Sequence, residues 1–256
     1  MNHSKLAEEL FDCLKAVKSV GPLTTRYPNI SIDDAYQISL ELMALRAAAG
    51  EKIIGKKIGV TSKGVQDMLG VYQPDYGFLT NKMLCESQEA ITSKLILPRA
   101  EAEIAFKLKE TLIGPSVSAQ DVLKATEYVT PAIEVVDSRI KDWKIKIEDT
   151  IADNASCGLF VVGKEQIDPR TLNLAELEVT FTKNGEIESI GKSSEVMGNP
   201  LNAVAWLANK LGELGVSLNA GEIILSGSMV PLAPAVKGDI FEMNIEGLGG
   251  CCVEFI

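Results

Sequence analysis

The sequence predicts an α+β domain rather than a doubly wound parallel sheet. Two observations support this class: helical periodicity is concentrated near the N-terminus, and short β-rich segments recur after residue 50. Too few helices lie between those segments to alternate regularly with the strands, as a doubly wound sheet would require. We therefore expect a small helical subdomain at residues 1–50 and a catalytic domain at residues 51–256.

Two helices are expected in the N-terminal region. Residues 4–18 place leucines at helical spacing, as in Leu6 and Leu10. Residues 31–50 begin with Ser31, a residue type that caps helix N-termini, followed by two aspartates that favour the positive end of the helix dipole. A glycine at residue 50 provides the stop.

Strands dominate the chain after residue 50, interrupted by a few helices. The expected helices are residues 61–70, 117–129 and 200–213. The helix at 61–70 has Thr61 or Ser62 as its N-cap, and in the helix at 117–129 Ser118 and Asp121 are spaced as in a capping box. The expected strands are residues 52–60, 98–106, 131–139, 176–182, 222–226, 239–245 and 251–255.

The overall charge excludes some classes of partner. The chain has 256 residues, of which 46% are hydrophobic, and a formal net charge of −10. Its densest basic run is "KDWKIK" at residues 141–146, so we expect no nucleic-acid partner. No apolar stretch approaches the roughly 20 residues of a membrane span, so we expect no membrane partner. An anionic substrate would need a local cation, because the overall field is unfavourable to it.

The reactive residue types are limited. The N-terminal segment has no apolar core of signal-peptide length, and the five cysteines include no C-x-x-C pair, so we expect reduced thiols in a cytoplasmic protein. The only histidine is His3, which excludes a histidine-based triad or metal site within one chain. Acid–base chemistry therefore falls to Asp, Glu, Lys, Tyr or Cys, and a metal site would be all oxygen, as Mg²⁺, Mn²⁺ and Ca²⁺ prefer.

Three glutamates lie within apolar strand sequences. Glu101 and Glu103 share one face of the strand "PRAEAEIAF", and Glu134 lies among branched apolar residues in "PAIEVVDSR". Close carboxylates repel each other, and burial increases the cost. The pattern leaves two interpretations open: solvent-facing residues of half-exposed strands, or a three-carboxylate metal site.

Most of the chain after residue 50 resembles the 2-keto-4-pentenoate hydratases, also called 2-hydroxypenta-2,4-dienoate hydratases, of the fumarylacetoacetate hydrolase superfamily. The resembling segments are "IGKKIGVTSKGVQDMLGVYQPDYGFL" (54–79), "PRAEAEIAF" (98–106), "PAIEVVDSRIKDWKIKIEDTIADNASCGLFVVG" (131–163), "NPLNAVAWLANKLG" (199–212) and "AGEIILSGSMVPL" (220–232).

The resemblance implies a mixed β-roll or distorted sandwich and a bound Mg²⁺ or Mn²⁺. The implied metal ligands are Glu101, Glu103 and Glu134. The implied reaction adds water to 2-hydroxypenta-2,4-dienoate and gives 4-hydroxy-2-oxopentanoate, in the meta-cleavage degradation of aromatic rings. The substrate would be a small 2-hydroxy-dienoate or 2-oxo acid.

The proton carriers are expected among two lysines and an aspartate. Lys57 matches the active-site lysine of the family and is expected to bind the carboxylate or to act in acid–base chemistry, with Lys56 as the competing assignment because neighbours in a strand face opposite ways. Asp75, in "QPDYG", is the candidate to orient or deprotonate water, although a turn residue is an equal interpretation. Arg99 and Arg139 are expected to pair with acids near the site.

Candidate substrate-binding residues lie in two polar segments. "IADNASCG" contributes Asp153 and Ser156, and "SGSMVP" contributes Ser226 and Ser228 beside backbone N–H groups on a tight turn. The alternative for these residues is a structural one, as caps or turns.

Three other functions remain open at this point. One is a decarboxylase of the same superfamily acting on 2-oxo-3-hexenedioate (4-oxalocrotonate), in which we expect an apolar residue at the position of Asp75. Another is an acylpyruvate hydrolase, which commonly uses a histidine that this chain lacks. The third is a non-catalytic partner subunit of the decarboxylase, against which the intact site residues argue. The resemblance also suggests a closed homo-oligomer and a complex with the homologous decarboxylase.

Overall fold

The computed structural model describes the backbone of residues 1–256 and all side chains except those of Met68 and Leu69. The α-helices are α1 (His3–Ala16), α2 (Leu23–Arg26), α3 (Ile32–Ala48), α4 (Lys63–Leu69), α5 (Ala119–Ala125), α6 (Ile147–Ala152) and α7 (Pro200–Gly212). The strands are β1 (Ile53–Gly59), β2 (Asp75–Thr80), β3 (Glu89–Ala90), β4 (Arg99–Leu108), β5 (Thr126–Val136), β6 (Cys157–Val162), β7 (Glu178–Lys183), β8 (Glu186–Lys192), β9 (Ile223–Leu225), β10 (Ala233–Pro234), β11 (Ile240–Ile245) and β12 (Gly249–Phe255).

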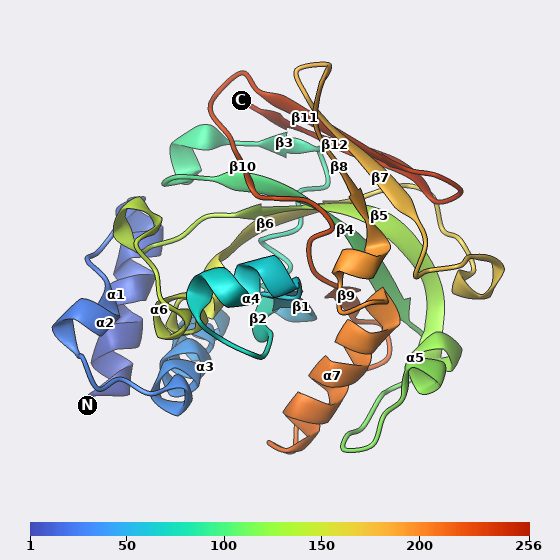
Figure 1. Cartoon of the computed structure of the whole chain (residues 1–256). Coiled ribbons are helices and arrows are strands. Elements are labelled where there is room, and N and C mark those ends of the chain that lie inside the picture. Colours follow the sequence, from blue (N-terminus) through green and yellow to red (C-terminus); the bar gives the residue numbers. More distant parts are fainter.

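The strands form two sheets, which confirms the mixed α+β class. The larger sheet has the order β2-β1-β9-β4-β5-β6, with β10 paired to β4, and the smaller sheet has the order β3-β12-β11-β7-β8. In Figure 1 the smaller sheet lies at the top of the view, helices α1, α2, α3 and α6 lie on one side below it, and α5 and α7 lie on the other. β11 and β12 pack against β5, so one large apolar core joins the two sheets.

The N-terminal helices form as the sequence predicts. Ser31 caps α3, and its side chain and that of Asp34 form a reciprocal capping box. The expected boundary at residue 50 falls between α3 and β1. Leu10 and Leu42 belong to the same core cluster as the strands, and the division into two domains stays a prediction.

The prediction of a helix over residues 117–129 is wrong at its C-terminal end. The Ser118–Asp121 capping box starts α5 as expected, but the helix ends at Ala125. The following residues are Thr126, Glu127, Tyr128 and Val129, and they continue as β5 because they pair with β4. β-branched and aromatic residues suit a strand when a neighbouring strand is available. The sequence analysis also did not predict β2, β6, β8 or α6.

Strand β4 is the central element around which the site is built. It pairs with β5 along nearly its whole length, in a register that sets Glu101 opposite Glu134. From Ala100 to Phe106 every residue of β4 is buried, so the three glutamates are not solvent-facing as the first interpretation supposed. Both faces of the strand are covered, so the face that carries Glu101 and Glu103 is buried as well as the face that carries Ala102 and Ile104.

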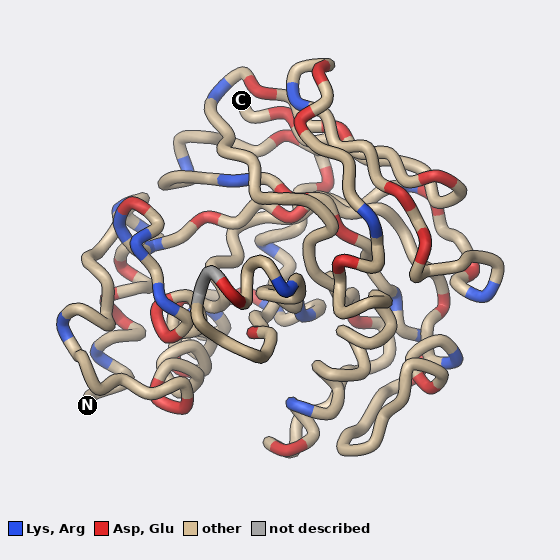
Figure 2. The backbone as a smooth tube through the Cα atoms, in the orientation of Figure 1, with Lys and Arg blue, Asp and Glu red and all other residues tan. Residues whose placement is uncertain are grey.

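Charged residues are distributed around the whole molecule. Figure 2 shows Lys and Arg positions interspersed with Asp and Glu along the chain. No helix among the described residues combines the length and apolarity that crossing a bilayer requires.

A left-handed turn connects α6 to β6 beside the sheet. Asn154, Ala155 and Ser156 have φ angles of 53°, 50° and 53°. This conformation costs residues with a Cβ roughly 1–2 kcal/mol each. The Asn154 side chain offsets part of that cost: its Oδ1 accepts a hydrogen bond from Phe78 N at 2.8 Å, and its Nδ2 donates one to Phe78 O at 2.9 Å.

Substituting Gly77 should destabilise this turn. A Cβ added at Gly77 would lie 2.6 Å from the carbonyl oxygen of Asn154, a backbone atom that cannot rotate away. We expect Gly77→Ala to lower the free energy of unfolding by about 1–3 kcal/mol in urea denaturation. Gly21→Ala, where a Cβ meets nothing within 4 Å, should stay within about 0.5 kcal/mol of the parent protein. Equal stability of the two variants would contradict this account.

Candidate active site

Three buried glutamates converge on adjacent strands. Glu101, Glu103 and Glu134 each offer a carboxylate oxygen, and these atoms all lie within 4.8 Å of one another. The two β4 glutamates share a face because they are two residues apart, and the β4–β5 register brings the third beside them. The structure therefore brings together the trio that the sequence analysis nominated.

Three carboxylate oxygens of this trio have no hydrogen-bond partner among the described residues. Glu103 Oε1 and both carboxylate oxygens of Glu134 are buried without a hydrogen-bond partner among the described residues. Burial and then the neighbouring Glu134 raise the pKa of Glu101 to about 8 and raise the pKa of Glu103 well above its usual value. Unpaired buried carboxylates that repel each other suit a hard divalent cation with oxygen ligands. The residues present therefore fit the implied metal ion.

Among the described residues, few groups compensate the negative charge of the trio. The backbone N–H of Gly227 donates a hydrogen bond to Glu103 Oε2 at 2.7 Å. Lys57 Nζ lies 3.4 Å from Glu134 Oε2. Burial alone would lower the pKa of Lys57, but the carboxylates of Glu134, Glu101 and Asp75 outweigh it and raise that pKa. The Lys57 side chain is therefore an ammonium ion within the site.

Asp75 lies beside Lys57 at the start of β2, not in a turn. The two strands that carry them are antiparallel neighbours with Asp75 opposite Gly59. A Cβ at Gly59 would collide with Asp75 Oδ1 and lie 3.2 Å from Lys57 Nζ, so glycine leaves the room that these two polar groups occupy. Asp75 Oδ1 is buried and has no hydrogen-bond partner among the described residues, and burial raises the pKa of this carboxyl although Lys57 opposes the shift.

Lys56 is excluded as the site lysine. It points to the other face of β1, where its Nζ lies 2.6 Å from Glu222 Oε2. Both side chains are at least nine-tenths buried, so this ion pair has a structural role in joining β1 to the segment before β9. Alternation along one strand thus separates a structural lysine from a site lysine.

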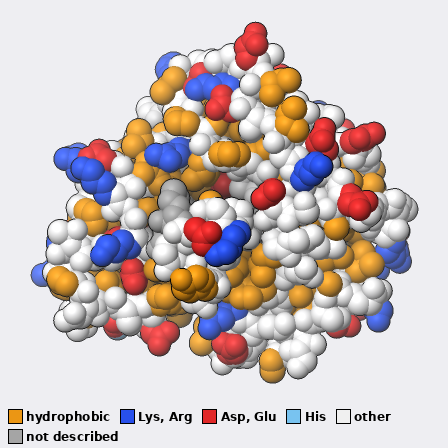
Figure 3. Space-filling model, in the orientation of Figure 1, with side chains coloured by type: hydrophobic (Ala, Val, Ile, Leu, Met, Phe, Trp, Pro, Cys, Tyr) orange, Lys and Arg blue, Asp and Glu red, His pale blue; other side chains and the backbone are white. Residues whose placement is uncertain are grey.

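Glu101, Glu103, Lys57 and Asp75 line one cavity of about 430 Å³, and Glu134 lies behind this wall, with a carboxylate oxygen within 4.8 Å of those of Glu101 and Glu103. The opening of the cavity lies beside α4 (Figure 3). Apolar side chains make up much of the wall, a composition typical of small-molecule sites. The cavity is lined by Lys57, Ile58, Gly59, Val60, Thr61, Ser62, Val65, Asp75, Arg99, Glu101, Glu103, Val136, Asp142, Trp143, Ile145, Thr150, Ala155, Ser156, Ser228, Val230, Pro231 and Leu232.

Two of the four predicted substrate-binding residues line this cavity. Ser156 reaches it from the left-handed turn, with its hydroxyl 3.2 Å from that of Thr150. Ser228 lines it from the segment after β9, and its hydroxyl donates to Val230 O at 2.6 Å. Ser226 is fully buried with an unpartnered hydroxyl but is not among the lining residues.

Asp153 faces away from the cavity into a buried ion pair. Its Oδ1 lies 2.5 Å from Arg139 Nε, and its Oδ2 accepts hydrogen bonds from Arg139 N and Ser138 Oγ. Burial raises the pKa of Asp153 to about 6, and Arg139 opposes the shift. The expectation that Arg139 pairs with an acid is confirmed, and it explains why Asp153 is not directed at the cavity.

The expectation that Arg99 pairs with an acid is wrong. No carboxylate among the described residues lies within 4 Å of its guanidinium, which instead lies 4.7 Å from the ring centroid of Trp143. Residues 141–146 were expected only as a basic run, and Trp143 was not predicted to be a site residue. The tryptophan within that run was the available signal.

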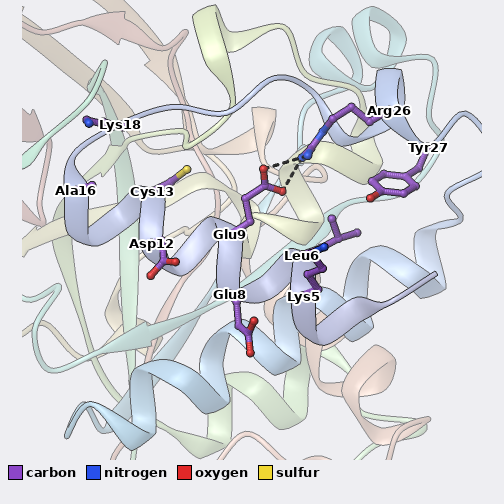
Figure 4. A pocket seen from close by; sticks show the side chains of 10 residues that line it. All are labelled: Lys5, Leu6, Glu8, Glu9, Asp12, Cys13, Ala16, Lys18, Arg26 and Tyr27. Atoms are coloured by element: carbon purple, nitrogen blue, oxygen red, sulfur yellow. Dashed lines mark hydrogen bonds and ion pairs between the residues drawn. The ribbon is translucent and has the colours of Figure 1, made fainter.

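A second hollow lies between α1 and α2 and carries none of the site residues. It measures about 600 Å³ and is wide open, and its charges are partly paired, as in the Arg26–Glu9 interaction at 2.9 Å (Figure 4). Its lining residues are Lys5, Leu6, Glu8, Glu9, Asp12, Cys13, Ala16, Lys18, Arg26 and Tyr27. The unpaired carboxylates single out the smaller cavity as the candidate active site.

Comparison with protein families and relatives supports this choice. The fumarylacetoacetate (FAA) hydrolase C-terminal family model matches residues 64–256. The chain is 55% identical over 251 residues to the 2-hydroxyhexa-2,4-dienoate hydratase of Comamonas testosteroni, covering 97% of this chain and 95% of that protein. It is also 55% identical over 216 residues to the 2-hydroxypent-2,4-dienoate hydratase of Pseudomonas putida, covering 84% of this chain and 97% of that protein.

A solved structure shares the whole architecture. The 4-oxalocrotonate decarboxylase from Pseudomonas putida G7, complexed with magnesium and adipate, superposes with a TM-score of 0.96 at 36% sequence identity. The superposition covers 99% of this chain and 97% of the decarboxylase. The arrangement of two sheets and flanking helices is therefore that of a known metal-binding enzyme.

Removing one carboxylate should weaken metal binding. We expect Glu103→Gln to reduce Mn²⁺ affinity by more than the roughly 10- to 100-fold that loss of an outer-shell partner costs, because it removes a ligand. Metal at 100 times its dissociation constant should stabilise the parent protein by about 2.7 kcal/mol, and this gain should be lost in the variant. Isothermal titration and thermal denaturation measure the two effects.

Glu127→Gln provides the matched control for Glu103→Gln. Glu127 lies on β5, the strand that carries Glu134, but its side chain is exposed. We expect unchanged Mn²⁺ affinity in this variant. Equal affinities of Glu103→Gln, Glu127→Gln and the parent protein would rule out the trio as the metal site.

Proposed function

The chain belongs to the fumarylacetoacetate hydrolase family, and from this premise we infer that it is a metal-dependent hydro-lyase of the meta-cleavage degradation of aromatic compounds. The reaction adds water to 2-hydroxypenta-2,4-dienoate and gives 4-hydroxy-2-oxopentanoate. The observation that carries this inference is that Asp75, a buried carboxylate with one unpartnered oxygen, lines the same cavity as Lys57, Glu101 and Glu103, with Glu134 directly behind the two glutamates. The 55% identity to two dienoate hydratases points to the same activity.

The proposed metal ligands are Glu101, Glu103 and Glu134, and the proposed ion is Mg²⁺ or Mn²⁺. When bound, the ion supplies positive charge that stabilises negative charge on the substrate's C2 oxygen. Three carboxylates leave positions for substrate or water oxygens around such an ion. The remaining work, which is to orient the dienoate and to move its protons, belongs to residues of the chain.

Two residues can carry the proton transfers. We assign to Lys57 the delivery of a proton to C5 and the recovery of the proton that leaves the C2 hydroxyl, which together convert the dienol to a 2-oxo-3-enoate. We assign to Asp75 the acceptance of a proton from water as the water oxygen bonds to C4, which is electrophilic through conjugation with the C2 carbonyl. The proton held by Asp75 then passes to C3, so one water molecule is added in total.

Substrate contacts are proposed for the serines around the cavity. Ser156 and Ser228 line it: the Ser156 hydroxyl can donate a hydrogen bond to a substrate oxygen, and the Ser228 hydroxyl, which donates to Val230 O, can accept one from the C2 hydroxyl of the substrate. Ser226 and Asp153 are not lining residues, so we assign them the support of the neighbouring turns. Val60, Val136 and Ile145 form apolar wall that suits the hydrocarbon part of a dienoate.

A superfamily decarboxylase acting on 4-oxalocrotonate is the second candidate. The structural similarity to the Pseudomonas putida G7 decarboxylase favours it, but that protein is 36% identical to this chain, against 55% for the two hydratases. A non-catalytic partner subunit is disfavoured because the trio and Lys57 are intact and close together. A cytoplasmic homo-oligomer that associates with the homologous decarboxylase is proposed from the resemblance, and light scattering with and without that enzyme tests the association.

The activity is tested by the ultraviolet absorbance of freshly generated 2-hydroxypenta-2,4-dienoate, with product masses measured. We expect metal-dependent loss of the dienoate signal, a gain of one water, and deuterium at C3 and C5 in deuterated water. EDTA should abolish the reaction, and Asp75→Asn should lower kcat by about 10²- to 10⁴-fold. No hydration with any metal, together with CO₂ release from 2-oxo-3-hexenedioate, would replace the hydratase assignment with the decarboxylase.

The two adjacent lysines should separate chemistry from stability. We expect Lys57→Met to lower kcat by about 10²- to 10⁴-fold, because it removes the proposed acid–base group. Lys56→Met should leave kcat close to that of the parent protein but lower the free energy of unfolding by about 3–5 kcal/mol, because Glu222 is left as an unpaired buried charge. The double variant Lys56→Met/Glu222→Leu should regain much of that stability. A large loss of kcat in Lys56→Met with none in Lys57→Met would assign the catalytic role to Lys56 instead.

A further inference from the structure

Arg99 lies on the same face of β4 as the two glutamates of the trio. It is two residues before Glu101 and four before Glu103, so the three side chains alternate onto one face. Arg99 also lines the active-site cavity and is partly exposed. Successive same-face positions of a strand are about 7 Å apart. The Cα of Arg99 is therefore about 7 Å from that of Glu101, on the side away from Glu103.

The guanidinium of Arg99 is held in place by a contact that leaves its N–H groups free. Its central carbon lies 4.7 Å from the Trp143 ring centroid, a cation–π distance. The ring is itself fixed, because Trp143 Nε1 donates a hydrogen bond to Leu97 O at 2.8 Å. No N–H of Arg99 donates to a described acceptor, whereas Arg139 places its donors on Asp153 and on backbone carbonyls. Arg99 is therefore pre-oriented and free to bind an anion.

The charge of the cavity requires such a cation. The trio and Asp75 are four carboxylates, and one divalent ion with Lys57 leaves a formal charge of −1 among them. Lys57 Nζ lies 3.4 Å from Glu134 Oε2, so the charge of this lysine is already compensated within the site. Asp142, which also lines the cavity, lies 3.6 Å from Lys144. Arg99 is the lining cation whose charge is not already balanced by a carboxylate among the described residues.

The chemistry of the substrate indicates which of its groups Arg99 meets. The 2-hydroxydienoate proposed above carries one anionic group, the C1 carboxylate, and its other end is a hydrocarbon. On β4, Arg99 is two residues before Glu101, whose strand partner Glu134 lies 3.4 Å from Lys57 Nζ. A guanidinium at this position with free donors therefore matches the C1 carboxylate and not the hydrocarbon end.

We propose that Arg99, oriented by the ring of Trp143, forms the subsite that binds the C1 carboxylate of the 2-hydroxydienoate. The proposal rests on the function proposed above and adds to it a specificity-determining residue. A planar guanidinium with free donors matches a carboxylate in two parallel hydrogen bonds. The interaction is present in both the bound substrate and the transition state, so it sets KM more than kcat.

The test measures binding directly, without turnover. In a Trp206→Phe background, Trp143 is the remaining tryptophan, and its fluorescence reports ligand binding next to Arg99. The probes are 2-oxopentanoate, which has the carboxylate but no reactive double bond, and its neutral amide, 2-oxopentanamide. Both are titrated into the Mg²⁺-loaded protein and its variants.

We expect Arg99→Met to weaken 2-oxopentanoate binding by about 10- to 100-fold and to leave amide binding unchanged. Arg99→Lys should fall between the parent protein and Arg99→Met, since it keeps the charge but not the planar fork. Arg170→Met removes the same charge from an exposed residue outside the cavity and should match the parent protein. Mn²⁺ affinity of Arg99→Met should be unchanged or higher, which verifies an intact metal centre.

Three results would overturn the proposal. Equal binding of 2-oxopentanoate by Arg99→Met and the parent protein would exclude a carboxylate subsite. Equal weakening of the acid and the amide would assign Arg99 a structural role. Weakening confined to a dicarboxylate, 2-oxohexanedioate, would show that Arg99 reads the distal end of the ligand instead of C1. Failure of the hydratase assay leaves this test intact, because the probes report binding and not hydration.

In kinetics with the dienoate, the same variant should raise KM by about 10- to 100-fold with little change in kcat. The decline of kcat/KM with ionic strength should be shallower in Arg99→Met than in Arg170→Met, because the steering charge is lost only from the cavity. Equal salt dependence of the two variants would contradict a role of Arg99 in recruiting the anion.

Discussion

Repulsion among three buried carboxylates is the constraint on which the rest of the structure depends. Glu101 and Glu103 face Glu134 across the β4–β5 ladder with oxygen atoms within 4.8 Å of one another. Such an arrangement is costly in a protein interior unless positive charge compensates for it. The ammonium of Lys57 and the N–H of Gly227 supply part of that compensation, and a divalent cation held by the trio would supply the rest. Lys57 belongs to β1 and Gly227 follows β9, so these contacts connect both segments to β4.

The ends of the central strands are held by polar side chains that never reach the cavity. Asp137, just after β5, accepts hydrogen bonds from Ile96 N and Leu97 N immediately before β4. The Arg139–Asp153 ion pair anchors the α6–β6 connection. These ties fix the register in which Glu134 meets Glu101 and the turn from which Ser156 reaches the cavity. Positioning of the site therefore depends on buried polar contacts as much as on apolar packing.

The metal centre alone does not choose between water addition and decarboxylation. A divalent ion held by the same trio would stabilise negative charge on a substrate oxygen in either reaction. What distinguishes the reactions is which groups around the centre can move protons and which part of the substrate they face. In this chain Lys57 and Asp75 reach the cavity from β1 and β2, whereas Arg99 reaches it from the first residue of β4. An asymmetric cavity of this kind orients a substrate that has one charged end and one reactive hydrocarbon end.

Local patterns within the sequence determined much of the fold class and the identity of the site. The absence of any histidine other than His3 excluded imidazole chemistry, and strand alternation put Glu101 and Glu103 on one face and separated Lys57 from Lys56. The N-cap at Ser31 and the capping box of Ser118 and Asp121 were also predicted, because capping depends on residues only three apart. The family resemblance implied the roles of Lys57 and of the trio, which spacing alone left open, whereas the role of Asp75 stayed open.

Only the tertiary structure decided the features that depend on residues distant in sequence. α5 ends at Ala125 because β4 offers pairing to the next residues. Asp153 is turned from the cavity because Arg139 lies beside it, and Arg99 is left unpaired because the ring of Trp143 holds it. Contacts of this kind have no signature in local periodicity, since they arise when separate strands and loops are packed together. Sequence thus gives the residue types of the site, and packing decides which of their charges remain free.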